Sequence, residues 1–284
     1  MSLFLRDDLA ALWQGDDPFQ RAAQQPGQVY RAREGRRTLQ FAAADGHSYF
    51  LKYHGGIGWK EILKNLSQFK APVLGAMAEV RAIHAVAAAG LDTMTLAGYG
   101  ERGSDPARRE SFLVTDDLVD TLSLEQVGES WVAAGHTPLL FKRALIARVA
   151  AISRTLHGAG INHRDYYLGH FLMPAAAVAA EDAQAPLYLI DLHRAQVRAK
   201  VPARWRVKDL GGLYFSSARY GLTRRDLLRF LKVYTGLPLR QALRQHRWLL
   251  AASRREAERV YQRYFEQPAA FPLQYCDEPP GKDS

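Results

Sequence analysis

Apolar and polar residues alternate in three short stretches near the start of the chain. A period of two is typical of strands with one buried face, so strands are predicted at residues 28–33, 38–42 and 48–53. Asp45 and Gly46 lie between the second and third stretches, and Asp-Gly in that setting favours a tight hairpin. This pattern predicts an antiparallel sheet in the first third of the chain.

Other segments before residue 116 have a period close to that of a helix. Helices are expected at residues 3–14, 59–69 and 74–89, and further strands at 95–102 and 111–115. Pro72 separates the last two helices, because its ring cannot continue a helical turn. Gly90 can end the third helix in a left-handed conformation.

Beyond this region the pattern is mainly helical. Residues 139–159 form a long amphipathic pattern, and the alanine-rich residues 174–186 are interpreted as an exposed loop. The change of pattern predicts an α+β protein with two lobes. We place a small β-rich lobe at 1–116 and a larger, mainly helical lobe at 117–284, with a hinge near 115–118.

Composition narrows the class of protein. The 284 residues are 48% apolar and 24% charged, as in soluble globular proteins. Cys276 is the single cysteine, which excludes an internal disulfide and a cysteine zinc site. Charge at Arg6 comes too early for a secretory signal, and no apolar run approaches the ~18 residues of a membrane span. We therefore expect a cytoplasmic protein, which could still sit on a membrane surface.

The formal charge of +9 points to anionic partners. Residues 224–263 hold eleven Lys and Arg against three acids, so nearly all of the surplus lies there. Thr223 and Asp226 have the spacing of a capping box, which predicts a helix at the start of this region. We interpret it as a docking face for anionic lipid head groups and an acidic saccharide; a solvated helical surface is the alternative.

The triplet His163-Arg164-Asp165 has the form of a kinase catalytic loop. Asp165 is expected to orient the attacking hydroxyl and accept its proton. Arg164 would steady the loop electrostatically, and His163 would pack and hydrogen-bond rather than react. The alternative is that Asp165 is an ordinary turn residue.

Asp191 follows the apolar residues 187–190, and a carboxylate at the end of such a strand costs free energy if unpaired. The Mg²⁺ of a nucleotide would satisfy it; a turn cap or a pair with Arg194 are alternatives. His170 stands five residues after Asp165, where protein kinases carry a metal-binding Asn. Because Mg²⁺ prefers oxygen, His170 is a doubtful metal ligand that could instead bond a phosphate.

Lys52 is the one lysine in an apolar strand, where a kinase lysine binds the nucleotide's α- and β-phosphates. Such a lysine needs a carboxylate to hold it. Glu79 is our candidate because it follows on the predicted helix, and Glu61 is the second choice. The alternatives are an exposed strand lysine and a solvated helix face.

The rest of the nucleotide site is less marked. Residues 30–50 contain no glycine-rich phosphate loop, so Arg36 or Arg37 is a candidate to grip phosphate bidentately. A solvated charged turn is equally compatible with this segment. The backbone of Thr115, Asp116, Asp117 and Leu118 is a candidate to bond the adenine edge, although the same residues also read as a buried strand with a polar end.

These motifs resemble the lipopolysaccharide core heptose(I) kinase family of the WaaP/RfaP type, within the protein-kinase-like superfamily. The likeness runs over residues 3–240. The stretches that carry it are 36–39, 49–52, 56–65, 72–76, 162–165, 170–172 and 190–197. His170 in place of Asn, and Asp191-Leu-His193 in place of Asp-Phe-Gly, depart from protein kinases and look like this family.

The resemblance implies a bilobal protein-kinase-like fold and an enzyme that uses ATP and Mg²⁺. It implies transfer of the γ-phosphate to O4 of the first heptose of the lipid A–core oligosaccharide, at the inner face of the inner membrane of a Gram-negative cell. It also implies acyl carrier protein as a partner. Asp209, on the expected central helix of the large lobe, would brace the catalytic loop.

Two other functions remain open from the motifs. One is a kinase of the same fold for another small alcohol or for protein tyrosine. The other is a silent pseudokinase that binds a membrane or nucleic acid through its basic charge. No nucleic-acid module is recognisable, so no nucleic-acid partner is expected. The presence of Lys52, Asp165 and Asp191 argues against a silent protein.

Overall fold

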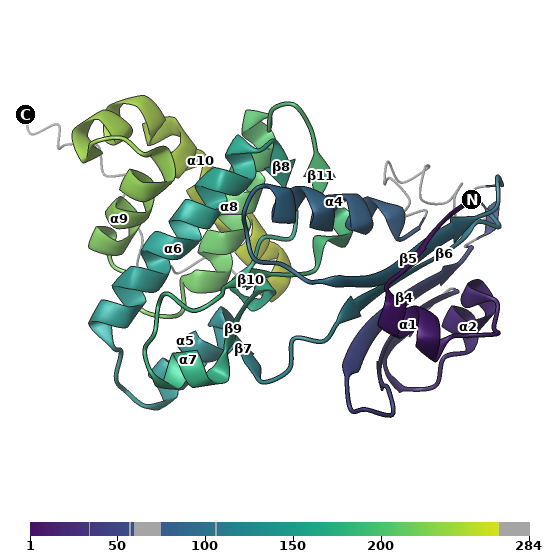
Figure 1. Cartoon of the computed structure of the whole chain (residues 1–284). Helices are drawn as coiled ribbons and strands as arrows, with labels where there is room; N and C mark the ends of the chain where they lie inside the picture. The colour runs from purple at the N-terminus through teal and green to yellow at the C-terminus, as the bar shows by residue number, and fades with distance from the viewer. Residues whose placement is uncertain (34, 57, 60–74, 106, 267–284) are drawn as a thin grey trace, which may run out of the picture. The chain divides into compact units, whose positions relative to one another are not determined.

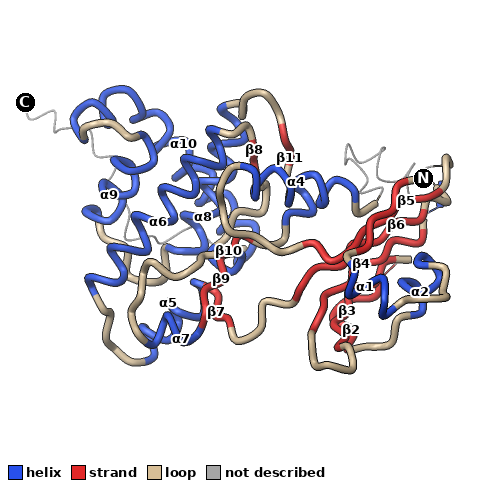
Figure 2. Tube along the Cα trace, in the orientation of Figure 1, coloured by secondary structure: helices blue, strands red, loops and turns tan. Residues whose placement is uncertain are grey.

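The computed structural model describes residues 1–33, 35–56, 58–59, 75–105 and 107–266. The chain divides into two compact units. The first unit comprises Met1–His84 and Met94–Val119, and the second comprises Ala85–Thr93 and Asp120–Ser284. Helices and strands are both prominent (Figure 2), which confirms the predicted α+β class.

The first unit extends three residues past the boundary that the sequence suggested. Asp117 explains this, because its amide donates to the carbonyl of Ser48 and its carboxylate accepts from the Ser48 hydroxyl at 2.8 Å. The second unit also includes residues 85–93, which the predicted boundary placed with the sheet. The Thr93 hydroxyl donates to the Leu189 carbonyl, and the Leu189 backbone amide donates to the Asp92 carbonyl. These two hydrogen bonds hold residues 92 and 93 to the second unit.

A six-stranded antiparallel sheet forms the first unit (Figure 1). Its strands, in spatial order, are β1 (Ser2–Leu5), β5 (Leu96–Arg102), β6 (Glu110–Asp116), β4 (Ser48–Gly55), β3 (Arg36–Ala42) and β2 (Gln28–Arg33). The predicted hairpin at Asp45-Gly46 is confirmed, since it joins β3 to β4 with Gly46 at φ +87°. The positive φ is why glycine suits this turn.

Two short helices, α1 (Asp7–Leu12) and α2 (Pro18–Gln24), lie against the sheet (Figure 1). Trp13 and Phe19 pack with Leu39 and Leu51 from the central strands in one buried cluster. Because side chains alternate across a strand, Lys52 is on the other face of the sheet. The hydrophobic core therefore holds the strand that carries Lys52 without surrounding the lysine.

The predicted helix at residues 3–14 is wrong at its start. Residues 2–5 form β1, which pairs with β5, and the helix begins only at Asp7. Arg6 explains the change of direction, because its amide donates to the Ala97 carbonyl and its guanidinium bridges Asp8 and Asp116. A short apolar run has no period that separates strand from helix, so only the neighbouring strand decides it.

The helix predicted at 74–89 is α4 (Met77–Ala88), and Gly90 follows it at φ +75°, as expected of a helix stop. The helix predicted at 59–69 lies almost entirely outside the described residues, together with Glu61. The preference for Glu79 over Glu61 as the partner of Lys52 therefore stays a prediction.

The second unit is mainly helical. Its helices are α5 (Leu124–Ala133), α6 (Leu139–Gly158), α7 (Ala175–Ala179), α8 (Ala203–Ser217), α9 (Arg224–Thr235) and α10 (Leu239–Phe265). The predictions of a long helix at 139–159 and of a capping box at Thr223 are confirmed. The loop predicted at 174–186 is partly wrong, because α7 lies within it. Alanine has the highest helix propensity, so an alanine-rich run favours a helical turn over a loop.

Short strand pairs hold the loops of the second unit. β8 (Ile161–Asn162) pairs with β11 (Gln196–Val197), and β9 (Phe171–Pro174) lies between β7 (Thr121–Ser123) and β10 (Tyr188–Leu189). The segment with Asp165 runs from β8 to the 3₁₀ turn η1 (Leu168–His170), and Asp191 stands between β10 and the turn η2 (Leu192–Arg194). These pairings bring together side chains that lie 26 positions apart in the sequence.

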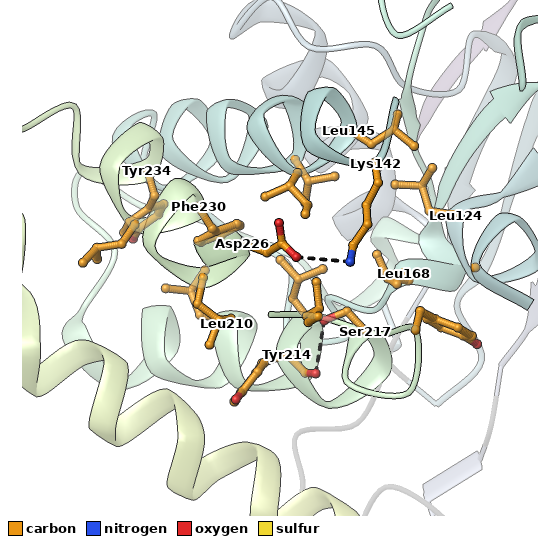
Figure 3. Close-up of a pocket in the computed structure, with 18 of the residues that line it drawn as sticks. Leu124, Lys142, Leu145, Leu168, Leu210, Tyr214, Ser217, Asp226, Phe230 and Tyr234 are labelled. Carbon is orange, nitrogen blue, oxygen red and sulfur yellow. Dashed lines mark hydrogen bonds and ion pairs between the residues drawn. The ribbon is translucent and has the colours of Figure 1, made fainter. Parts of the chain in front are cut away.

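An apolar cavity of about 160 Å³ lies among α5, α6, α8, α9 and α10 (Figure 3). Lys142 and Asp226 point toward each other in its wall, with 3.1 Å between Nζ and Oδ2, and both side chains are buried. The cavity has none of the polar groups of the Asp165 and Asp191 loops. It is a feature of the helical core, and its lining does not include Asp165 or Asp191.

We expect Asp226→Asn to lower the free energy of unfolding by about 3 kcal/mol, because it leaves the Lys142 ammonium buried without its counter-charge. Burial raises the pKa of Asp226, but hydrogen bonds from Thr223 and Lys142 outweigh it and lower the pKa overall. A depressed pKa means that the ionised carboxylate stabilises the fold above pH ~4 and that this contribution is lost as the pH falls below that value.

Urea unfolding of the native chain and of Asp226→Asn at pH 7 and at acid pH measures both effects. The variant should show a smaller loss of stability on acidification than the native protein. Asp182→Asn is the control, since Asp182 is exposed. A variant as stable as the native protein at pH 7 would contradict the role of the buried pair.

Candidate active site

Asp209 on α8 holds the backbone of the loop that contains Asp165. Its fully buried carboxylate accepts the amide hydrogens of His163 at 2.8 Å and Arg164 at 2.7 Å. His157 on α6 donates from Nε2 to the same carboxylate at 3.2 Å. Arg164 has φ +76°, a left-handed conformation that costs an ordinary residue free energy. The two amide bonds hold this strained turn immediately before Asp165.

His163 connects this loop to the strand before Asp191. Its ring is buried, and Nε2 donates to the carbonyl of Ile190 at 2.9 Å. Burial lowers its pKa, so the neutral form is favoured. The ring also stacks on His170 with 5.6 Å between centroids. These contacts are those of a packing residue.

Asp165 is ion-paired with a residue that the sequence did not associate with it. Arg194 Nη1 donates to Asp165 Oδ1 at 2.7 Å, and the aspartate side chain is 15% exposed. Its backbone carbonyl accepts from His170 Nδ1 at 2.7 Å. The sequence had suggested Arg194 as an alternative partner for Asp191; the structure pairs it with Asp165 instead. No local pattern signals a contact across 29 residues.

Asp191 lies in a left-handed turn at φ +59°, between two imidazoles. His193 Nδ1 donates to its Oδ1 at 2.7 Å, and His170 Nε2 is 3.6 Å from Oδ2. Since Nδ1 of His170 is committed to the Asp165 carbonyl, the contact with Asp191 uses the opposite side of the ring. Asp165 and Asp191 are therefore linked through His170.

The side chains around Asp191 decide whether the site fits a magnesium ion. In the part of the chain that the structure describes, no three His, Cys, Asp or Glu side chains gather as a metal site. Mg²⁺ is commonly bound by one or two carboxylates, with phosphate and water oxygens completing the shell. Asp191 is half-buried on a loop and supplies one such carboxylate. The residues thus fit a magnesium ion carried by nucleotide phosphates, with His170 an unfavourable ligand.

Lys52 and Glu79 are brought together in the first unit. Lys52 Nζ is 2.7 Å from Glu79 Oε1, and the glutamate side chain is only 3% exposed. β4 carries the lysine and the first turn of α4 carries the glutamate. This buried carboxylate fixes the direction of the lysine side chain.

The register of β3 and β4 separates the two arginines proposed for phosphate. Thr38 stands opposite Lys52, and Arg36 stands opposite His54, so Arg36 shares the face of Lys52. Arg37 is on the other face, where Nη1 donates to the Ala23 carbonyl at 2.6 Å. This geometry favours Arg36 over Arg37 as a phosphate contact.

The segment proposed for adenine, from Thr115 to Leu118, is partly engaged within the first unit. The amide of Asp116 donates to the Thr95 carbonyl, and that of Asp117 donates to Ser48. The Asp116 carboxylate binds Arg6 at 2.6 Å. A bound adenine edge would therefore have to use other backbone groups of this segment. Its role stays a prediction.

Sequence reasoning missed two residues of the second unit besides the Arg194 contact. The Tyr234 hydroxyl is hydrogen-bonded to His157 Nδ1 at 2.9 Å, and the other ring nitrogen of His157 bonds Asp209. Trp205, on the first turns of α8, has the Arg164 guanidinium 4.9 Å from its ring centroid. A cluster of basic residues around the only tryptophan in 200–210 is a signal that could have found Trp205.

Comparison with known proteins identifies the family. The profile of the Lipopolysaccharide kinase (Kdo/WaaP) family matches residues 20–234. The Lipopolysaccharide core heptose(I) kinase WaaP of Pseudomonas aeruginosa is 50% identical over 264 residues, which are 93% of this chain and 97% of that protein. The protein of the same name from Escherichia coli (strain K12) is 50% identical over 259 residues, 91% of this chain and 97% of that protein.

The fold is also similar to that of a solved relative. The structure described as WaaP in complex with acyl carrier protein has a TM-score of 0.77 and 44% identity, and the match covers 92% of this chain and 100% of that one. The protein-kinase-like fold expected from the sequence is confirmed. By profile, by identity over nearly its whole length and by fold, the chain belongs to the lipopolysaccharide kinase (Kdo/WaaP) family.

Proposed function

We propose that this protein is an ATP-dependent kinase that phosphorylates O4 of the first heptose of the lipopolysaccharide inner core. The observation that carries the proposal is the braced loop of Asp165, with Arg194 on its carboxylate, in a chain 50% identical to heptose(I) kinases. Phosphoryl transfer to an alcohol requires one carboxylate that acts as the base and another that holds the metal. Asp165 and Asp191 are the candidates for these two roles.

Asp165 is the proposed catalytic residue. It accepts a hydrogen bond from the acceptor hydroxyl and takes its proton as the oxygen bonds to the γ-phosphorus and the bond to ADP breaks. Arg194 is bonded to Oδ1 and so fixes the orientation of the carboxylate, which leaves Oδ2 for the acceptor hydroxyl. Arg164 and His163 hold the loop, and Asp209 braces it through two amides.

Lys52, oriented by Glu79, is the proposed contact of the α- and β-phosphates, and Arg36 is a second phosphate contact on the same face of the sheet. Asp191 would hold the Mg²⁺ that accompanies ATP, and that ion would supply charge neutralisation on the phosphates. His170 positions Asp191 and the Asp165 backbone rather than ligating the metal. Residues 115–118 are proposed to meet the adenine.

We place the reaction at the cytoplasmic face of the inner membrane of a Gram-negative cell, where a lipid-anchored core saccharide would be met. Among the described residues no helix is both long and apolar enough to cross a membrane. The basic residues of α9 and α10 support a peripheral attachment to anionic lipid. A relative solved with acyl carrier protein supports the same partner for this chain.

The decisive test offers ATP and defined heptosylated lipid A–sugar acceptors, and locates the new phosphate by NMR. We expect it on O4 of the first heptose. Asp165→Asn should lower kcat by about 10²- to 10⁴-fold, the range for loss of a general base, with little change in ATP binding. Asp182→Asn, on an exposed loop, is the matched control.

Two results would overturn this mechanism. Near-normal turnover in a folded Asp165→Asn variant would remove the aspartate from the chemistry. Phosphate found on protein alone, with none on sugar, would favour the protein-tyrosine alternative over the heptose kinase.

Glu79→Gln tests the nucleotide half of the site separately. The amide keeps the shape of the side chain but removes the charge that holds Lys52, so ATP affinity should fall by about tenfold or more. Titration calorimetry with a non-hydrolysable ATP analogue and Mg²⁺ measures this directly. Glu129→Gln, an exposed glutamate on α5, is the control. Unchanged affinity would exclude a phosphate-binding role for the pair.

Vesicle sedimentation tests the membrane attachment. Vesicles with anionic lipid should retain the protein at low salt and release it at high salt, and each basic residue at the surface is worth about 1 kcal/mol. Replacing the exposed Arg224 and Arg225 by Gln should weaken retention. Equal binding to neutral vesicles, unaffected by salt, would rule out the basic helices as the docking face.

A further inference from the structure

Four cationic side chains surround one tryptophan ring in the second unit. Each lies within 6 Å of the Trp205 centroid: Arg164 at 4.9 Å, Arg204 at 5.4 Å, Arg198 at 5.6 Å and Lys208 at 5.6 Å. We call these five residues the Trp205 cluster. They come from three segments of the chain, namely the catalytic loop, the end of β11 and the start of α8.

The cluster holds its four cations without a direct acidic partner among the described residues. Within the described residues, none of its four cations forms an ion pair with an acid. Arg198 instead donates to two neutral side-chain amides, on Asn162 at 3.0 Å and on Gln196. Trp205 Nε1 and Arg164 Nε are buried with no hydrogen-bond partner in the same described part of the chain. Positive charge and donor capacity are therefore both in excess.

This arrangement is costly without a ligand. Burial and the charges of neighbouring arginines lower the pKa of Arg164 and of Lys208, although nearby Asp165 raises both. A lowered pKa means that the folded protein disfavours these charges. Cation–π contact with an indole offsets part of this cost, but one ring cannot stabilise four cations equally well. An anion would relieve the repulsion.

The cluster shares its supports with the catalytic loop. Arg164 directly precedes Asp165, and its amide is held by Asp209, the residue after Lys208. Arg194 acts electrostatically on Arg164 and Lys208 while it binds Asp165. A ligand held by the cluster is therefore positioned relative to Asp165 by the same rigid α8 framework.

We propose that the Trp205 cluster is an acceptor subsite that binds an anionic group of the saccharide, a sugar carboxylate or a phosphate monoester, and so positions the reacting hydroxyl at Asp165. The inference rests on the proposed function and extends it to substrate recognition. Arginine suits this task because its planar guanidinium grips such groups bidentately. The remaining source of the same chemistry is a phosphate of the nucleotide.

Arg204→Gln/Lys208→Gln is the test variant, since neither residue contacts Asp165 or Asp191. The control is Arg81→Gln/Arg143→Gln, which changes the net charge equally at exposed positions on α4 and α6. Soluble, deacylated core oligosaccharide serves as acceptor, so that no membrane contributes. It is used as such, with its phosphate monoesters removed, or with its carboxylates reduced to alcohols.

The test variant should raise the acceptor KM by about tenfold or more, with the ATP KM unchanged, and the control should keep both. Removing the group that the cluster recognises, carboxylate or phosphate, should raise the acceptor KM of the native protein by the same factor. It should not raise the acceptor KM of the test variant further. Because Lys208 is disfavoured as a charge, the variant should have a Tm equal to or above that of the native protein. A residue with a purely structural role would instead lower the Tm.

Calorimetric binding of the oligosaccharide without ATP separates this proposal from the proposed function. If binding depends on an acidic group and on Arg204 and Lys208 but no phosphate is transferred, the subsite is supported and the heptose kinase function is excluded. Transfer with an unchanged acceptor KM in the test variant would remove the subsite alone. A rise in the ATP KM only would assign the cluster to the nucleotide and overturn the proposal.

Discussion

The second unit depends on one buried carboxylate. Asp209 accepts two successive amides, from His163 and Arg164, and so stabilises a left-handed turn that the chain would otherwise avoid. Asp165 takes its position from that turn. A carboxylate this deep is tolerated because backbone amides and His157 satisfy it. The geometry of the loop is therefore set by a buried side chain of α8 rather than by the loop residues alone.

Histidine links the two carboxylates that the chemistry would use. His170 bonds the backbone of Asp165 on one side of its ring and lies beside Asp191 on the other, while His163 stacks on it. In protein kinases a metal-binding Asn occupies this position. Here the ring is a spacer between the proposed base Asp165 and the proposed magnesium ligand Asp191.

Positive charge is distributed unevenly over the second unit. Arg194 neutralises Asp165, whereas the Trp205 cluster gathers cations that no acid in the described residues pairs. The exposed arginines of α9 and α10 form another basic region. A long-range attraction to anionic membranes and a short-range grip on an acidic saccharide are different tasks, and separate groups of residues are suited to each.

The sequence by itself determined the local features. Period-two alternation and Asp45-Gly46 predicted the β3–β4 hairpin, Thr223 and Asp226 predicted the cap of α9, and the spacing of Asp165 and Asp191 singled out the candidate chemistry. These features depend on neighbours a few residues apart, which composition and periodicity record directly. The family resemblance also came from such local motifs.

Tertiary structure decided which distant groups meet. The pairing of Arg194 with Asp165 rather than Asp191, and the placement of Arg37 on the far face of the sheet from Lys52, follow from strand register and loop closure. The first residues became a strand because β5 offered an open edge, not because of their own pattern. Contacts across many residues are set by packing of the whole chain, and a single sequence carries no periodic signal for them.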